Sequence, residues 1–321
     1  MLETTLALAG ANLLAPTILF FLLGLVAALA RSDLSIPAGA AKVMSIYLLF
    51  AIGYKGGVSV AENGINLQLG TSILLGLVVS FVIPFVAYFI LRAMTKLDQL
   101  NAAAVAGHYG SISIVTFVTA TSVLDSAGLT YEGYLIAVAA MMEAPAILSA
   151  LWLATGGRSI NTKVLRDIAG NGSIVLLLGS FLIGVITGPQ GMEQVSPFIV
   201  APFTGVLCIF LLDMGLSAGT NLQKNRKMID MSIVAFGLIM PLIAAAIGAV
   251  AGVILGLSVG GIFLFMTLCA SASYIAVPAA VRIALPQAQP GIYLTLALGI
   301  TFPFNIAIGL NLYLIVAQWL G

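Results

Sequence analysis

The chain has 321 residues, of which 61% are hydrophobic and only 7% are charged. Soluble domains carry about 25% charged residues, so 12 basic and 11 acidic side chains are too few to cover a water-soluble surface of this size. The net charge of +1 says nothing about nucleic acid, but the chain has no basic domain to bind it, so we expect no nucleic-acid partner.

Apolar stretches long enough to cross about 30 Å of hydrocarbon follow one another along the chain. Apolar stretches separated by Gly, Pro and polar residues predict ten transmembrane helices, near 11–30, 36–54, 69–91, 99–122, 131–154, 172–188, 196–216, 229–257, 260–282 and 290–320. The first lacks the features of a signal peptide, so we expect it to be retained. The last is longer than one crossing requires and is expected to be tilted or interrupted. These patterns predict an all-α integral membrane protein.

Basic residues gather in alternate loops of this topology. Eleven of the twelve lie in the loops that follow odd-numbered spans: Arg31, Lys42, Arg92, Lys96, Arg158, Lys163, Arg166, Lys224, Arg226, Lys227 and Arg282. Only Lys55 lies on the other side. Because Lys and Arg near helix ends are retained on the cytoplasmic side, we expect a multi-pass protein of the inner (plasma) membrane with both termini on the outer side.

The two halves of the chain carry similar residues in the same order. Seven pairs match at offsets of 157 to 162 residues: Gly53 with Gly215, Gly57 with Gly219, Pro84 with Pro241, Ser111 with Ser271, Ser113 with Ser273, Tyr134 with Tyr293, and Pro145 with Pro303. They predict a first five-helix repeat over 1–157, a cytoplasmic linker over 158–171 and a second, inverted five-helix repeat over 172–321. The alternative is a large helical bundle whose two halves are similar in amino-acid composition without being structural repeats. The glycine pairs are expected at helix contacts.

The fourth and ninth spans carry small and hydroxyl residues at mid-membrane depth, which favours broken helices. Broken backbone is tolerated in a membrane where it lines a cavity, and inversion would bring two helix N-termini to one point. Such termini bind anions without any arginine. The predicted anion-facing residues are Gly110, Ser111, Ser113, Ala270, Ser271 and Ser273. The alternative is that these small residues only permit close helix packing.

Glu143 is a carboxylate inside an apolar run, where an unpaired charge costs about 3 kcal/mol or more. Pro145 frees a backbone carbonyl one turn back, and Thr116 offers a nearby hydroxyl. Hard cations prefer such oxygen ligands, so we expect Glu143 to bind Na⁺; a protonated or interhelical structural Glu is the alternative. In the other half, Thr301 and Asn305 offer neutral oxygen atoms. We expect Na⁺ as a coupling ion and no other metal or cofactor.

Two further polar residues lie inside spans. Asp213 belongs to a packing helix and is expected to have a structural or gating role, and His108 is expected to be a neutral hydrogen-bonding residue. His108 as a proton acceptor is the alternative. Although His108 and Ser111 lie three residues apart, no nucleophile elbow or third catalytic group accompanies them. We therefore expect a transporter and not an enzyme; a channel is the other candidate.

Six segments together carry a resemblance that spans nearly the whole chain: AIGYKGG, HYGSISIVTF, MMEAPAI, FLLDMGLSAG, SASYIAVPAAVRIALP and LGITFPFN. They resemble the sodium-dependent bicarbonate permease family of SbtA-like bicarbonate/sodium symporters. The resemblance implies a fold like that of the bile-acid/sodium symporters, with a core of spans three to five and eight to ten and a gate of spans one, two, six and seven. It also implies sodium-driven bicarbonate uptake by elevator-like alternating access, a homotrimer, and a cytoplasmic PII-like regulator as a partner.

The chain departs from this family in two places. Tyr274 stands where cyanobacterial members carry an acid, and the loop after the fifth span has only about 17 residues where they carry a long insert. The phenolic oxygen of Tyr274 is a further predicted sodium ligand, and the short loop leaves less material for docking a regulator. The alternative function is a sodium- or proton-coupled transporter of another small anion, such as a short carboxylate, with Glu143 or His108 as the proton-binding group.

Overall fold

The computed structural model describes residues 14–64, 66–156, 170, 172–225, 229–274, 277–278, 281 and 285–321. In these ranges all regular secondary structure is helical. The beginning of the first expected span, nearly all of the linker 158–171, and part of the ninth span beyond Tyr274 lie outside the described residues. The same holds for six of the basic loop residues: Arg158, Lys163, Arg166, Arg226, Lys227 and Arg282.

The first half of the chain forms these helices: α2 Pro16–Leu29, α3 Ala38–Asn63, α4 Leu67–Met94, α5 Gln99–Gly110, α6 Ile114–Ala127, α7 Leu135–Met141 and α8 Glu143–Ala154. Side-chain caps fix where several of them begin. The Asn66 side chain accepts a hydrogen bond from the Leu69 N–H at the start of α4, and Asp98 does the same for Asn101 at the start of α5. Each cap satisfies one of the N–H groups that the first helical turn leaves unpaired.

The second half forms these elements: α10 Gly172–Ile199, α11 Phe203–Asn225, α12 Met231–Ile254, α13 Val259–Ala270, α15 Pro290–Leu294, η1 Thr295–Thr301, α16 Phe302–Phe304, η2 Asn305–Gly309 and α17 Leu310–Leu320. The η elements are wide π-helical turns, which flank Pro303. Since proline lacks an N–H and its ring clashes with the preceding turn, the tenth span is interrupted there, as its excess length predicted.

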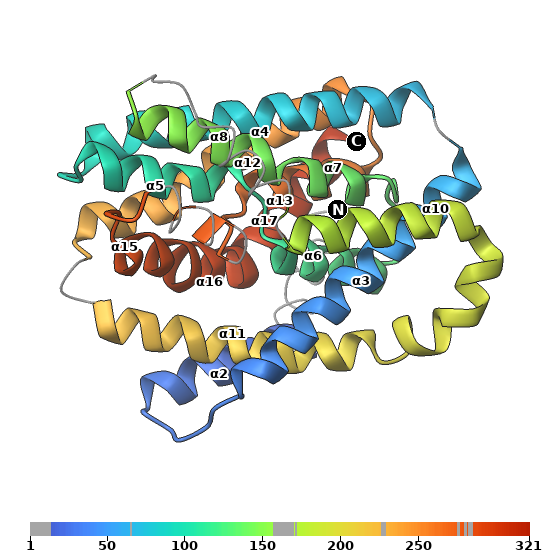
Figure 1. Ribbon diagram of the computed structural model, residues 1–321, viewed down its shortest axis with the longest axis horizontal. Coiled ribbons are helices and arrows are strands. Elements are labelled where there is room, and N and C mark those ends of the chain that lie inside the picture. Colours follow the sequence, from blue (N-terminus) through green and yellow to red (C-terminus); the bar gives the residue numbers. More distant parts are fainter. Residues whose placement is uncertain are drawn as a thin grey trace.

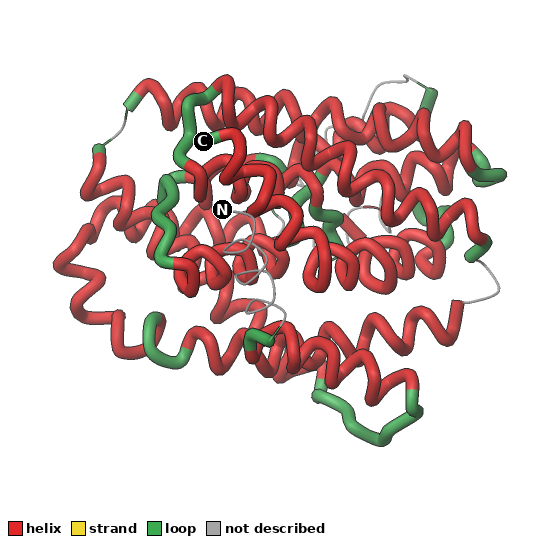
Figure 2. The backbone as a smooth tube through the Cα atoms, turned by 180° about the vertical axis from the view of Figure 1, so that it is seen from behind, coloured by secondary structure: helices red, strands yellow, loops and turns green. Residues whose placement is uncertain are grey.

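Eight described helices or helix pairs are long and apolar enough to cross a membrane. Two shorter apolar helices, Pro16–Leu29 and Val259–Ala270, lie where the first and ninth spans were expected. Most helices run along the long axis of the molecule in Figure 1, and the view from behind in Figure 2 shows the same arrangement without any strand in the described part. The chain is therefore a multi-pass helical membrane protein.

Four helices, α2, α3, α10 and α11, form one layer, which we call the four-helix layer. In it α2 packs on α11 and α3 packs on α10 (Figure 1). Both pairs come together backbone to backbone at glycine: a Cβ atom built on Gly57 would lie 1.9 Å from the carbonyl oxygen of Phe181, and one on Gly215 would lie 2.1 Å from that of Phe21. The prediction that these glycines mark helix contacts is confirmed.

The other helices, α4 to α8 with the described helices from α12 to α17, form a second unit, which we call the broken-helix body. In its first half α5 packs between α4 and α8, and in its second half α13 packs between α12 and α17. The two halves meet where α4 contacts α12 and where α6 contacts α13. The four-helix layer contacts this body through α3 and α10 on α7, and through α11 on η1 and α15.

Two predicted boundaries are wrong. The second span does not end at residue 54, since α3 continues to Asn63; Lys55 therefore lies inside a helix, with its ammonium 4.5 Å from the centroid of the Phe203 ring. The segment between the sixth and seventh spans is helical to Ile199, with a kink at Gly188 (φ 56°, ψ −153°). Glycine alone adopts this backbone readily, and Pro189 suits the first turn of the helix that follows.

Candidate functional site

The fourth span is broken between α5 and α6. Ser111 (φ −94°, ψ 150°) and Ser113 (φ −99°, ψ 107°) have extended backbone. The Ser113 hydroxyl oxygen then starts α6, because it accepts hydrogen bonds from the Thr116 N–H (3.2 Å) and the Thr116 hydroxyl (2.9 Å). Gly110 ends α5 against proline, since a Cβ atom there would lie 2.3 Å from Pro84 Cγ. The predicted break is confirmed.

The ninth span is broken in the same way. Helix α13 ends at Ala270, and Ser271 has extended backbone (φ −82°, ψ 159°). The Ala270 carbonyl, freed by the break, accepts a hydrogen bond of 2.9 Å from the Asn305 amide. The Ser271 hydroxyl donates to the carbonyl of Leu268 at 2.9 Å. Polar side chains therefore satisfy backbone that a membrane helix would otherwise leave unpaired.

The two breaks cross and hydrogen-bond to each other. The Ser113 N–H donates to the Ser271 hydroxyl oxygen at 2.9 Å, and the Ser273 N–H donates to the His108 carbonyl at 2.7 Å. All four residues are buried. Residues about 160 positions apart in the chain are thus held together at one point, as the sequence predicted for the fourth and ninth spans.

A small cavity lies beside this crossing. Its volume is about 10 Å³, the space for about one water molecule or small ion. Its lining residues come from the four-helix layer, both breaks and α8: Leu49, Ile112, Ser113, Ile114, Glu143, Ser273 and Tyr274. Ile114 is the first residue of α6, so a helix N-terminus lies at the cavity. Such a terminus is equivalent to about half a positive charge.

Glu143 is the one ionisable acid among the lining residues. It is the first residue of α8, directly after an interruption at Met142, and is only 6% exposed. Among the described residues its carboxylate has no hydrogen-bond or ion-pair partner. The Ser80 hydroxyl donates to the Met142 carbonyl and holds the interruption against α4. A buried charge without a partner is costly, so this carboxylate requires a cation or a proton.

The structure brings four of the predicted site residues to the cavity: Ser113, Glu143, Ser273 and Tyr274. Four others belong to the crossing but do not line the cavity: Gly110, Ser111, Ala270 and Ser271. Thr116 does not line it either and donates a hydrogen bond to the Ser113 hydroxyl. The Ser111 hydroxyl is buried without a partner in the described part of the chain. The anion-binding and sodium-binding roles of these residues stay predictions.

Thr301 and Asn305 lie away from the cavity lining and are held in a hydrogen-bond network. The Thr301 hydroxyl donates to the Gly237 carbonyl (2.7 Å) and accepts from the Tyr109 hydroxyl (2.6 Å). The Asn305 side-chain oxygen accepts from Tyr313 at 2.8 Å. These contacts brace α12 and the second break, while the proposed contact of both residues with sodium stays a prediction.

His108 and Asp213 occupy different surroundings. The His108 Nδ1 lies 2.7 Å from the Ala104 carbonyl, which can only accept, so Nδ1 carries the proton, and the ring stacks on Tyr293 with centroids 4.6 Å apart. The expected hydrogen-bonding role in the helix is confirmed. Asp213 is partly buried on α11 and lines a separate cavity between α2 and α11.

Four residues of the site were not predicted. Leu49, Ile112 and Ile114 line the cavity, and Ser80 holds the α7–α8 interruption. A leucine or isoleucine in an apolar helix gives no signal that it faces a site. Ser80 lies four residues before Pro84 in the same helix, but this spacing alone does not indicate a contact with Met142.

Apolar spans, two broken helices that cross inside the protein and a buried acid without a partner are typical of membrane transporters. The family model described as the Na⁺-dependent bicarbonate transporter superfamily matches residues 16–318. The chain belongs to this superfamily, as the resemblance predicted, and is a membrane transport protein. A search of curated proteins finds no match to the chain.

Proposed function

We propose that this protein is a secondary active transporter that couples bicarbonate uptake to the entry of Na⁺. The observation that carries the proposal is the Glu143 carboxylate, which faces the cavity at the crossing without a described partner. Superfamily membership supports both the ion and the anion. The protein acts by binding and movement, without chemical conversion of its substrate and without a resident cofactor.

In this proposal Na⁺ binds first, at Glu143. Ser113, Ser273 and Tyr274 line the same cavity, and in this proposal their hydroxyl groups supply further oxygen atoms, the ligand type that hard cations prefer. Binding of Na⁺ offsets the cost of the buried carboxylate. It also removes a negative charge that would repel an incoming anion, and this is the physical basis of coupling.

Bicarbonate then binds at the crossing, against the N-terminus of α6. Unpaired N–H groups and about half a positive charge at such a terminus stabilise an anion. Gly110, Ser111 and Ser113 in the first break, with Ala270, Ser271 and Ser273 in the second, are the proposed contacts. The cavity of about 10 Å³ is too small for both ligands, so binding of bicarbonate requires the crossing to open.

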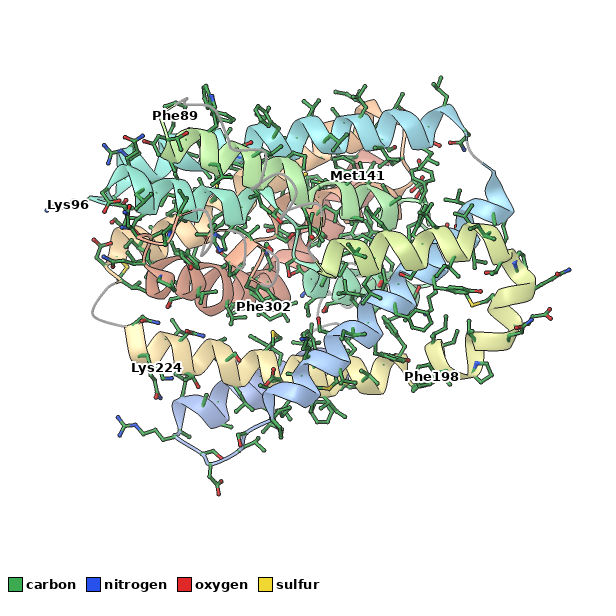
Figure 3. The ribbon with its side chains drawn as sticks, in the orientation of Figure 1. Phe89, Lys96, Met141, Phe198, Lys224 and Phe302 are labelled. Atoms are coloured by element: carbon green, nitrogen blue, oxygen red, sulfur yellow. The ribbon has the colours of Figure 1, made fainter. Side chains whose placement is uncertain are left out.

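Alternating access is proposed to move the broken-helix body against the four-helix layer in an elevator-like manner. The glycine contacts that join α3 to α10 and α2 to α11 support the layer as a rigid unit. The layer pairs the first helix of each half with the second helix of the other half, which supports the ten-span arrangement of inverted repeats over 1–157 and 172–321. Lys96 and Lys224 lie toward the same end of the molecule, opposite Phe198 (Figure 3), which supports a cytoplasmic basic face and termini on the outer side.

The proposal includes assembly as a homotrimer in the plasma membrane and a PII-like cytoplasmic regulator. Both rest on superfamily membership alone.

Uptake of labelled bicarbonate into proteoliposomes, with and without an inward Na⁺ gradient, tests the function. We expect accumulation that requires the gradient. Accumulation of a short carboxylate in place of bicarbonate would overturn the substrate, accumulation driven by a proton gradient would overturn the coupling ion, and passive flux without any gradient would indicate a channel.

A further inference from the structure

A second cavity, of about 450 Å³, lies between the end of α2, the connection at 30–36 and the second half of α11. This volume is in the range of small-molecule sites, about 300–1,000 Å³. Its lining is mostly polar, and the residues that matter here are Arg31, Ser32, Asp213, Thr220, Asn221 and Lys224. It belongs to the four-helix layer and shares no lining residue with the cavity at Glu143.

Arg31, which lines this cavity, has an unusual backbone conformation. It follows α2 with φ 60°, and among the described residues no other residue besides glycine has a positive φ. The Arg31 N–H donates to the Ala28 carbonyl (3.0 Å) and the Ser32 N–H to the Ala27 carbonyl (2.9 Å), so Arg31 closes the helix in the position that glycine usually occupies. An arginine held there at a conformational cost indicates a functional role for its side chain.

Lys224 brings a second positive charge from the facing helix. Its neighbour Gln223 donates to the carbonyls of Ala28 (3.1 Å) and Leu29 (2.9 Å), so this end of α11 is fixed against the end of α2. Arg31, directly after α2, and Lys224, near the end of α11, therefore line the same cavity from two different segments. Neither forms an ion pair with an acid in the described part of the chain. Figure 3 shows Lys224 toward the end of the molecule that also carries Lys96.

The charge of the lining changes along α11. Asp213 is the one acid that lines the cavity, and it precedes Lys224 by eleven residues on α11. At 1.5 Å per residue it lies about 16 Å farther along the helix. Ser217, Thr220 and Asn221 lie between the two levels on the same helix. The lining thus includes two cations, Arg31 and Lys224, hydroxyl and amide groups next to Lys224 on α11, and one acid farther along this helix.

We propose that this cavity binds the phosphate group of a phosphate ester between Arg31 and Lys224. Arginine and lysine on opposite sides of a phosphate make charge-assisted hydrogen bonds with its oxygens, and Thr220 and Asn221 donate to the same group. The phosphate belongs to a lipid headgroup or to a soluble ester; the chemistry that recognises it is the same. By joining α2 to α11 the ligand stabilises the four-helix layer.

Thermal unfolding of the full-length protein tests the site independently of transport. The protein is placed in phosphatidylcholine bilayers alone, with phosphatidylglycerol added, or with inorganic phosphate added to the buffer. We expect at least one probe to raise the unfolding midpoint. The double variant Arg31→Gln/Lys224→Gln should require about tenfold more of that probe or respond not at all, because it loses two charge-assisted hydrogen bonds.

Lys42→Gln is the matched control, since Lys42 is exposed on α3 and does not line the cavity. A second variant, Thr220→Glu, keeps both cations and adds a repelling charge at an exposed position of the lining, so it tests the site even if the double variant does not fold. A response to phosphatidylglycerol alone identifies a lipid, and a response to phosphate alone a soluble ester. No response of the wild type to either probe, or equal responses from Lys42→Gln and the site variants, would overturn the proposal.

Discussion

Replacing Glu143 by glutamine tests the coupling mechanism most directly. The amide has nearly the shape of the carboxylate and keeps one oxygen toward the cavity, but it removes the negative charge that faces Ser113 and Tyr274. The loss is therefore electrostatic and not a matter of packing. Because the wild-type carboxylate has no described partner, its removal leaves no buried cation behind.

The magnitude follows from Coulomb's law. Two unit charges about 4 Å apart attract by about 4 kcal/mol at an effective dielectric constant of about 20. The amide oxygen and the hydroxyls recover part of this, so we expect a loss of about 2–3 kcal/mol, which corresponds to a decrease of about 30- to 150-fold in Na⁺ affinity. Bicarbonate uptake should also become less dependent on Na⁺, because the charge that repels the anion is absent.

The assay is a Na⁺ titration of bicarbonate uptake into proteoliposomes, together with direct calorimetric measurement of Na⁺ binding. Glu62→Gln is the matched control, because Glu62 is an exposed acid at the end of α3. A Glu143→Gln protein that is folded and retains the Na⁺ affinity of the control would show that Glu143 is not the sodium ligand, and the coupling mechanism would be wrong.

Three other variants test the architecture. Gly57→Ala should destabilise the protein by about 2 kcal/mol or more, because the added Cβ would overlap the Phe181 carbonyl. Gly39→Ala is the control: its Cβ would have no neighbouring atom within 4 Å, so the unfolding midpoint should not change. Equal unfolding midpoints for the two variants would refute the contact. Ser113→Ala removes the cap of α6 and should lower the free energy of unfolding by about 1 kcal/mol while raising the KM for bicarbonate. Normal uptake by this variant would show that the Ser113 hydroxyl does not contact the substrate. The Asp98 carboxylate caps α5, and the hydrogen bond that it accepts from the Asn101 N–H lowers its pKa. Its contribution to stability should therefore be present at neutral pH and be lost as pH falls below about 4. Asp98→Asn should unfold with a smaller pH dependence in acid, and an unchanged pH dependence would contradict the cap.

The sequence predicted the broken helices because the physical signal for them is local. Small and hydroxyl residues around Ser111 and Ser271 cannot sustain a helix as strongly as their apolar neighbours, and the structure has breaks at both positions. Glycine pairs such as Gly57 and Gly215 likewise predicted close helix contacts. Each signal is a property of the residues themselves, so a single sequence contains it.

The composition of the cavity depends on packing, which a single sequence does not contain. Thr301 and Asn305 were predicted as sodium ligands by the same argument as Glu143, and their contact with sodium stays a prediction. The sequence could not show that their oxygen atoms bond to Tyr109, Gly237 and Tyr313. Hydropathy could not show that Lys55 continues α3, because a charged residue next to glycines is also typical of a loop.

The pair of hydrogen bonds at the crossing has a mechanical consequence. Since the Ser113 N–H is bound to Ser271 and the Ser273 N–H to His108, neither broken span can slide along the membrane normal without pulling the other. Residues of both breaks, and the cavity that they line, would therefore shift together in the proposed movement of the broken-helix body.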